Sequence, residues 1–171
     1  YQTMVSDLTG MDISNASLLD EPTSAAEAMM LAKRVAKSKS NTFFINSKTF
    51  KQTIAIIKSR AKPLGVEIEI GDCPDKEKEY FAAYFQYPNA EGSIEDLESV
   101  TKDIQAKGGL MIIGTDLLAL TLLKTPGDFG ADIAVGSAQR FGVPMGFGGP
   151  HAGFMAVKDV YKSCLLYTSP S

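Results

Sequence analysis

The sequence has few of the side chains that bind metals or cross-link small domains. Its 171 residues include only two cysteines, Cys73 and Cys164, which make no disulfide framework, so we expect a reducing compartment. A single histidine, His151, with two distant cysteines cannot build a zinc site, and no serine–histidine–aspartate set can be argued from it. The sequence therefore predicts no metal site.

Neither an excess of basic residues nor a long apolar run is present. The net charge is −3 and the basic residues are spread along the chain, which argues against nucleic acid or an anionic membrane as a partner. The longest apolar runs, such as residues 117–123, are too short to span a bilayer and suit buried elements. With 44% hydrophobic and 22% charged residues, the composition is that of a globular chain with a sizeable core.

Helical and strand patterns alternate along most of the chain. Apolar spacing together with start and stop residues predicts helices over residues 1–8, 23–37, 50–61, 94–106, 117–123 and 158–162. Alternating or continuous apolar runs predict strands over residues 42–45, 66–70, 80–87, 110–113, 133–135 and 152–157. The alternation indicates an α/β fold with a mostly parallel sheet flanked by helices.

The strongest local feature is a glycine-rich loop over residues 141–153, which reads FGVPMGFGGPHAG. Its glycines, among them Gly146, Gly148 and Gly149, allow positive φ and let backbone amides approach an anion or a neighbouring chain. The alternative is a packed turn between strands. A Rossmann fingerprint is excluded because the loop precedes a strand rather than a helix, and no P-loop sequence is present.

Three further positions each allow a functional and a structural interpretation. His151 could act as an acid or base or stack on a cofactor ring, or it could be a hydrogen-bonded structural residue. Asp116 ends an apolar strand, where α/β folds bind ligands, or it caps a helix over residues 117–123. The helix that opens at Thr23 and Ser24 offers amides and hydroxyls to an anion, or these groups serve ordinary capping.

Several stretches, taken together, resemble the glycine decarboxylase family, the P-protein of the glycine cleavage system. They are residues 1–21 (YQTMVSDLTGMDISNASLLDE), FQYPN, EGSIEDL, and residues 115–154, which contain the glycine-rich loop. The resemblance covers residues 1–162. Residues 163–171 leave the family pattern, so we interpret them as an unrelated tail, and the start at Tyr1 without a methionine as that of an internal fragment.

The resemblance implies part of the large domain of pyridoxal-phosphate fold type I, the fold of the aspartate aminotransferases. Members of the family release CO2 from glycine and pass the aminomethyl group to the lipoyl arm of the H-protein, with the cofactor's ring as electron sink. The expected partners are therefore glycine, lipoyl H-protein and the other half of the P-protein. The compartment would be the cytoplasm in a bacterium and the mitochondrial matrix in a eukaryote.

This sequence resembles the N-terminal half of the family protein, whereas the Schiff-base lysine belongs to a His-Lys-Thr run in the C-terminal half. The resemblance places Gln139 and Arg140 at that run, and Lys124 and Lys158 do not match it. An arginine stays protonated and forms no stable imine. We therefore expect no catalytic residue here, pyridoxal phosphate held by the other half, and a fragment that is inactive on its own.

In such an assembly the active site lies near the interface of the two halves. The resemblance implies that the glycine-rich loop faces this interface, with Gly146, Gly148, Gly149 and His151 as contact residues. By position, Asp116 resembles the aspartate that pairs with the pyridine nitrogen in the active half, so Asp116 and His151 are the candidates for cofactor contact. The alternative function is a non-catalytic scaffold half that only dimerises with the cofactor-bearing half and stabilises it.

Overall fold

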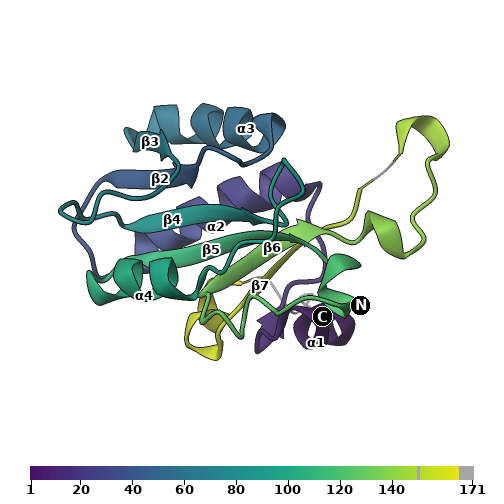
Figure 1. The fold of residues 1–171 in the computed structure, drawn as a ribbon. Helices are drawn as coiled ribbons and strands as arrows, with labels where there is room; N and C mark the ends of the chain where they lie inside the picture. The colour runs from purple at the N-terminus through teal and green to yellow at the C-terminus, as the bar shows by residue number, and fades with distance from the viewer. Residues whose placement is uncertain (150, 166–171) are drawn as a thin grey trace.

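A computed structural model describes residues 1–149 and 151–165 of the chain and contains one seven-stranded sheet (Figure 1). The strand order across the sheet is β1-β7-β6-β5-β4-β2-β3. The strands are β1 (Ile13–Ser14), β2 (Thr42–Asn46), β3 (Glu67–Gly71), β4 (Ala82–Tyr87), β5 (Leu110–Asp116), β6 (Ile133–Ser137) and β7 (Gly153–Val157).

The sheet is mostly parallel, as the sequence predicts. The five strands from β3 to β6 run parallel to their neighbours, while β7 is antiparallel to β6 and β1 is antiparallel to β7. The central strands are buried on both faces, which explains their continuous apolar sequences. The sequence did not predict β1, because two residues carry no periodic signal.

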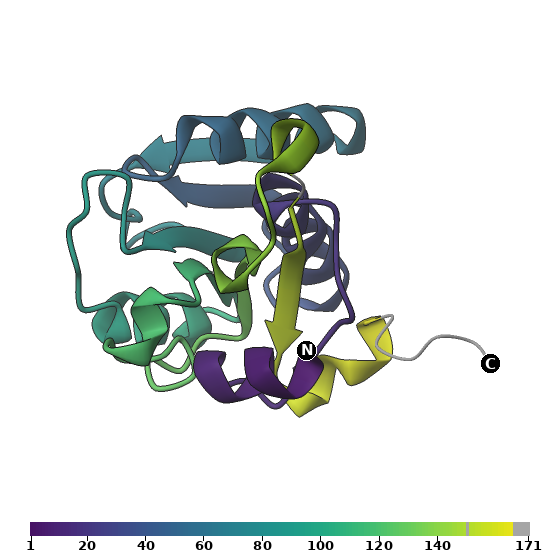
Figure 2. The same cartoon turned by 90° about the vertical axis from the view of Figure 1, so that its right-hand side faces the viewer.

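Helices cover both faces of the sheet. On one face, α2 (Glu21–Val35) and α3 (Lys51–Ala61) pack through Met29 and Ile57 onto strand residues such as Ile112. On the other face, α1 (Gln2–Thr9) and α4 (Glu98–Ala106) contribute Val5 and Ile104 to a second apolar cluster. Figure 2 shows α2 and α4 on opposite sides of the sheet. The expected α/β class is confirmed.

Two predicted helices are wrong in kind. Residues 117–123 form only a 3-10 turn, Ala119–Thr121, because the run is apolar on every side and Pro126 follows closely. Residues 158–162 belong to another 3-10 segment, Asp159–Cys164. Of the expected tail at 163–171, residues 166–171 lie outside the described residues, while the buried Leu165 packs in the core cluster beside α2.

Two helices, α2 and α4, start a few residues from the predicted position, and each has an acidic side chain at its start. The predicted helix over residues 23–37 begins at Glu21, because Asp20 caps it and Pro22 is tolerated in the first turn. The predicted helix over residues 94–106 begins at Glu98, whose amide donates to Asp96 Oδ1 at 3.0 Å. An acidic side chain thus fixes each start.

Candidate functional site

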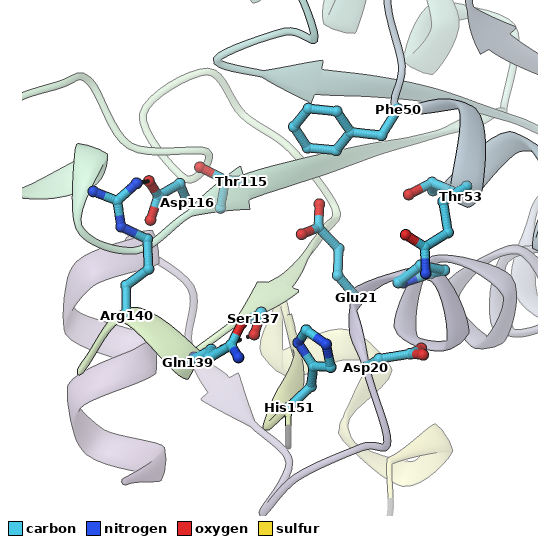
Figure 3. Close-up of a pocket in the computed structure, with 12 residues that line it drawn as sticks. Asp20, Glu21, Phe50, Thr53, Thr115, Asp116, Ser137, Gln139, Arg140 and His151 are labelled. Atoms are coloured by element: carbon cyan, nitrogen blue, oxygen red, sulfur yellow. Dashed lines mark hydrogen bonds and ion pairs between the residues drawn. The ribbon is translucent and has the colours of Figure 1, made fainter. Parts of the chain in front are cut away.

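A cavity of about 320 Å³ lies at the carboxyl ends of the central strands, where α2 and α3 begin. Thr115 of β5 pairs with Gly136 of β6, and Asp116 pairs with Ser137, so two neighbouring strands end together there. This edge is where open parallel sheets bind ligands. The residues that line the cavity are Asp20, Glu21, Pro22, Phe50, Gln52, Thr53, Thr115, Asp116, Ser137, Gln139, Arg140 and His151 (Figure 3).

Asp116 and Arg140 form an ion pair at one side of the cavity. Arg140 Nη1 lies 2.8 Å from Asp116 Oδ2, as the dashed line in Figure 3 marks. Asp116 Oδ1 also accepts the Leu118 amide at 3.0 Å. Both interpretations of Asp116 therefore hold in part: the side chain caps the turn that follows β5, and it also lines the cavity. Its charge is compensated within the chain.

Glu21 is a cavity residue that the sequence interpretation missed. Its side chain rises from the first turn of α2 into the middle of the site (Figure 3). Glu21 Oε1 accepts from Gln86 Nε2 at 3.1 Å, and Gln86 Oε1 accepts from the Tyr84 hydroxyl at 2.9 Å. The sequence signal was present in Asp20-Glu21-Pro22, but an acidic residue before a proline equally indicates a helix start.

Burial controls the protonation of this hydrogen-bonded chain. It raises the pKa of the fully buried Tyr84 well above 10, so the hydroxyl stays protonated and donates. Gln86 must then turn its amide nitrogen toward Glu21. Burial also raises the pKa of Glu21 to about 7; the hydrogen bond from Gln86 lowers it, and the charges of Asp116 and Asp20 raise it further.

The start of α2 is capped from within the chain. Asp20 Oδ1 accepts the Thr23 amide at 2.8 Å, and the Ser24 hydroxyl donates to the Asp20 carbonyl at 2.8 Å. These bonds use the groups that an external anion would need. Ordinary capping therefore accounts for Thr23 and Ser24, and the alternative of an anion site at this helix start finds no support.

The glycine-rich loop extends away from the body of the molecule (Figure 1). Gly148 and Gly149 have φ of 93° and 80°, as the sequence expectation of positive φ requires, whereas Gly146 does not. Phe147 and Met145 at the tip of the loop are almost wholly exposed. The loop is therefore not packed against this chain at its tip, and Pro150 lies outside the described residues.

The C-terminal end of the glycine-rich loop returns to the cavity. His151 is exposed and lines the cavity, with its side chain directed toward it in Figure 3. At Gly153 a Cβ atom would lie 2.6 Å from both the Asp20 carbonyl oxygen and Ser24 Oγ, so only glycine allows β7 to pass the start of α2 this closely. The loop thus joins the cavity wall to an exposed apolar tip.

The two lysines considered as imine-forming residues are engaged elsewhere. Lys124 Nζ lies 3.0 Å from Glu98 Oε2 and 4.7 Å from the centre of the Phe129 ring. Lys158 Nζ lies 2.8 Å from Asp132 Oδ1. No lysine lines the cavity among the residues that the structure describes. The same residues also contain no cluster of histidine, cysteine and carboxylate side chains that could hold a metal ion, and no helix long and apolar enough to cross a membrane.

Comparison with known families identifies the chain's relationship. The sequence-family model for the glycine cleavage system P-protein matches residues 1–165. The chain belongs to this family. Relatives named glycine dehydrogenase (decarboxylating) are 56% identical over 167 residues in Rhodopseudomonas palustris (strain BisA53) and 55% identical over 165 residues in Rhizobium meliloti (strain 1021). The matches cover 96% and 95% of this chain but 17% of each relative, so the chain spans about a sixth of their length.

Solved structures agree with the family assignment. A glycine decarboxylase P-protein in inhibitor-bound form superposes with a TM-score of 0.87 at 34% identity, over 96% of this chain and 39% of that one. An O-acetylhomoserine (thiol)-lyase from Campylobacter jejuni, which carries a pyridoxyl-lysine phosphate group, gives 0.72 at 16% identity over 96% and 41%. The expected fold is therefore confirmed: the sheet and helices are part of a pyridoxal-phosphate fold type I domain.

The cavity of this chain does not fit pyridoxal phosphate. An imine needs a lysine, and none lines the cavity among the described residues. The ring nitrogen would need a free aspartate, but Asp116 is already paired with Arg140. A phosphate dianion at the start of α2 would meet the carboxylates of Asp20 and Glu21. All three parts of the cofactor thus lack a suitable partner here.

Proposed function

We propose that this chain is part of a glycine dehydrogenase (decarboxylating) of the glycine cleavage system. The parent protein would release CO2 from glycine and pass the aminomethyl group to the lipoyl H-protein. The family membership and the names of the relatives support this proposal. Because the chain spans about a sixth of those relatives, the activity is proposed for the parent protein and not for this chain alone.

Within the parent, this chain belongs to the half that lacks the Schiff-base lysine, and pyridoxal phosphate is held by the other half or by a partner subunit. The observation that carries this proposal is the ion pair between Arg140 and Asp116 in the cavity. An arginine occupies the place where a cofactor-bearing half needs a lysine, and it neutralises the aspartate that would pair with the ring nitrogen. Gln139 beside it lines the same cavity and provides no amine nucleophile.

The glycine-rich loop is the contact surface for the other half. The exposed apolar tip at Phe147 and Met145 would gain from being covered by a partner. The glycine φ values set the course of the loop, and His151 connects it to the cavity. In this arrangement Gly146, Gly148 and Gly149 bring the backbone close to the partner, while His151 reaches toward the shared active site.

A non-catalytic scaffold remains the second candidate, and the same ion pair favours it. Arg140 and Asp116 neutralise each other, so neither side chain is free to take part in the reaction. In that case the half would dimerise with the cofactor-bearing half and stabilise it, without changing the rate of the chemical step. The two functions differ in what this half does to turnover.

The test is glycine decarboxylation by purified components. CO2 release from glycine is measured with the cofactor-bearing half and lipoyl H-protein, with and without the full-length form of this half. We expect release only in the complete mixture. Equal release per folded cofactor-bearing half in both mixtures, with higher thermal stability in the complete one, would favour the scaffold. No release in either would reject the assigned reaction.

A further inference from the structure

The cavity has more acidic than basic groups. Asp20, Glu21 and Asp116 line it, against one guanidinium, that of Arg140. Asp20 caps α2 and Asp116 is paired with Arg140, so both are compensated. Glu21 is different, because within the described part of the chain its hydrogen-bond donor is the neutral amide of Gln86. One carboxylate in the site is thus left without a counter-charge.

We propose that the cavity receives a cationic side chain, lysine or arginine, from a part of the parent protein outside this chain, and that Glu21 is its partner. This inference rests on the proposed function, in which a second half of the parent covers the cavity. It names the chemistry that the covering surface needs.

Two acceptor groups in the cavity are unused. The Tyr84–Gln86 chain holds one oxygen of Glu21, and Oε2 has no hydrogen-bond partner within the part of the chain that the structure describes. The Thr115 hydroxyl lines the same cavity, is buried with 1% of its surface exposed, and has no hydrogen-bond partner there either. Ammonium and guanidinium groups offer several N–H donors at once, so one of them can supply the donor that Glu21 Oε2 lacks.

Covering the cavity without a cation would be costly. Burial and the charges of Asp116 and Asp20 already disfavour ionised Glu21. A partner that removed the remaining water would add to this penalty, since an unpaired buried charge is strongly destabilising. A cation reverses the sign of the effect, because an opposite charge within a few ångströms stabilises the carboxylate. Charge complementarity therefore determines what kind of side chain can cover Glu21.

The cation must come from outside the described chain. No lysine lines the cavity among the described residues, and the one arginine that lines it, Arg140, is paired with Asp116. From α3, the lining residues bring no charge, and the remaining titratable group at the site is the exposed His151. The chain covers only 39% of a solved P-protein chain and about a sixth of its curated relatives, so most of the parent lies outside it.

The test is whether Glu21→Gln raises or lowers the thermal unfolding midpoint of the full-length parent protein, measured at pH 5, 6.5 and 8. If a cation pairs with Glu21, Glu21→Gln removes its counter-charge and lowers the midpoint by about 2 °C or more at pH 6.5 and 8. If no cation is present, the raised pKa persists. The wild type then loses stability as the pH rises through 7, and Glu21→Gln equals it at pH 5 and raises the midpoint at pH 8.

Two further variants keep the test decisive. Glu27→Gln removes a carboxylate from the same helix but outside the cavity, and it should not reproduce the effect. Glu21→Asp keeps the charge if Glu21→Gln fails to fold; its midpoint should not fall between pH 5 and 8, and a fall would contradict the cation. Because the test measures stability, it is independent of activity. If the parent is inactive on glycine but Glu21→Gln still lowers the midpoint, only the proposed function is rejected. An active enzyme stabilised by Glu21→Gln rejects only the cation.

Discussion

The two ends of the central strands carry carboxylates in opposite situations. At the amino ends, Asp132 is buried and accepts three hydrogen bonds, from Lys158 Nζ at 2.8 Å, the Met111 amide at 2.9 Å and Gln105 Nε2 at 2.8 Å. At the carboxyl ends, Glu21 has one neutral donor and a raised pKa. The carboxylate at the amino ends thus has a full set of hydrogen-bond donors and a counter-charge from its own chain, whereas Glu21 lacks a counter-charge among the described residues.

This difference separates stability from function within one sheet. The bonds of Asp132 join β5, α4 and the residue that follows β7, so they fix the strands to each other. At the opposite end, the cavity and the exposed glycine-rich loop leave polar and apolar groups without partners among the residues that the structure describes. Such incomplete satisfaction is typical of surfaces that bind something else.

The largest expected effect is at the amino ends of the strands. In the full-length parent, Asp132→Ala would leave the Met111 amide without its acceptor, and the Lys158 ammonium and the Gln105 amide with only the Gly130 carbonyl. We expect a loss of about 3 kcal/mol in the free energy of unfolding, as for other broken buried pairs. Denaturant unfolding followed by circular dichroism measures it. Asp128→Ala, in an exposed turn nearby, serves as control, and an equal loss in both variants would contradict the contrast.

A second effect concerns the core beneath the cavity. A methyl group at Gly114 would overlap the Tyr84 hydroxyl and lie 2.7 Å from Gln86 Oε1, where the chain to Glu21 is held. Gly114→Ala should therefore cost about 2 kcal/mol through overpacking. Gly71→Ala is the matched control, because a Cβ there would make only ordinary contacts, the nearest at 3.6 Å from Phe44, and its φ is not positive. Thermal midpoints of both variants compare them directly.

The third effect lies in the glycine-rich loop. Gly148 has a φ of 93° and nothing within 4 Å of a Cβ, so only backbone conformation opposes a larger residue. Gly148→Val should cost about 1 kcal/mol or more locally and should lower glycine turnover by displacing the loop. Size-exclusion chromatography of the assembled halves and the decarboxylation rate are measured on one preparation. If the rate and the assembly are both unchanged, the loop serves only as a turn between strands.

The smallest expected effect is that of His151. Because its side chain is exposed, His151→Ala should leave the thermal midpoint unchanged. If the loop faces the shared active site, turnover with glycine should fall by about fivefold, the loss of one hydrogen bond of about 1 kcal/mol, while the halves still associate. Normal turnover with normal assembly would leave His151 without a functional role.

Much of the fold was predictable because its signals are local. The continuous apolar run of β5 indicated a strand buried on both faces, and Gly10, with a φ of 67°, ends α1 as the sequence predicts. The helix predicted over residues 117–123 was wrong, since a mostly apolar run does not distinguish a helix from a packed turn. The two-residue β1 exists only through its pairing with β7.

The candidate site was predictable only in part, for a physical reason. Asp116, Gln139, Arg140 and His151 were singled out from the sequence, and they meet in one cavity. Glu21 was missed because its role depends on contacts distant in sequence, above all with Gln86. Local sequence indicates a helix start, but it carries no information about which strand end that start will face.

No lysine lines the cavity at the carboxyl ends of the strands among the described residues, so we expect the lysine that holds the cofactor to lie in another part of the parent. The direct test is to reduce the full-length parent enzyme with borohydride in the presence of pyridoxal phosphate and to map the labelled peptides. We predict one stoichiometric pyridoxyl-lysine, located outside residues 1–171, and the same label in Asp116→Asn. A stoichiometric label on Lys124, Lys158 or another lysine of this chain would contradict it.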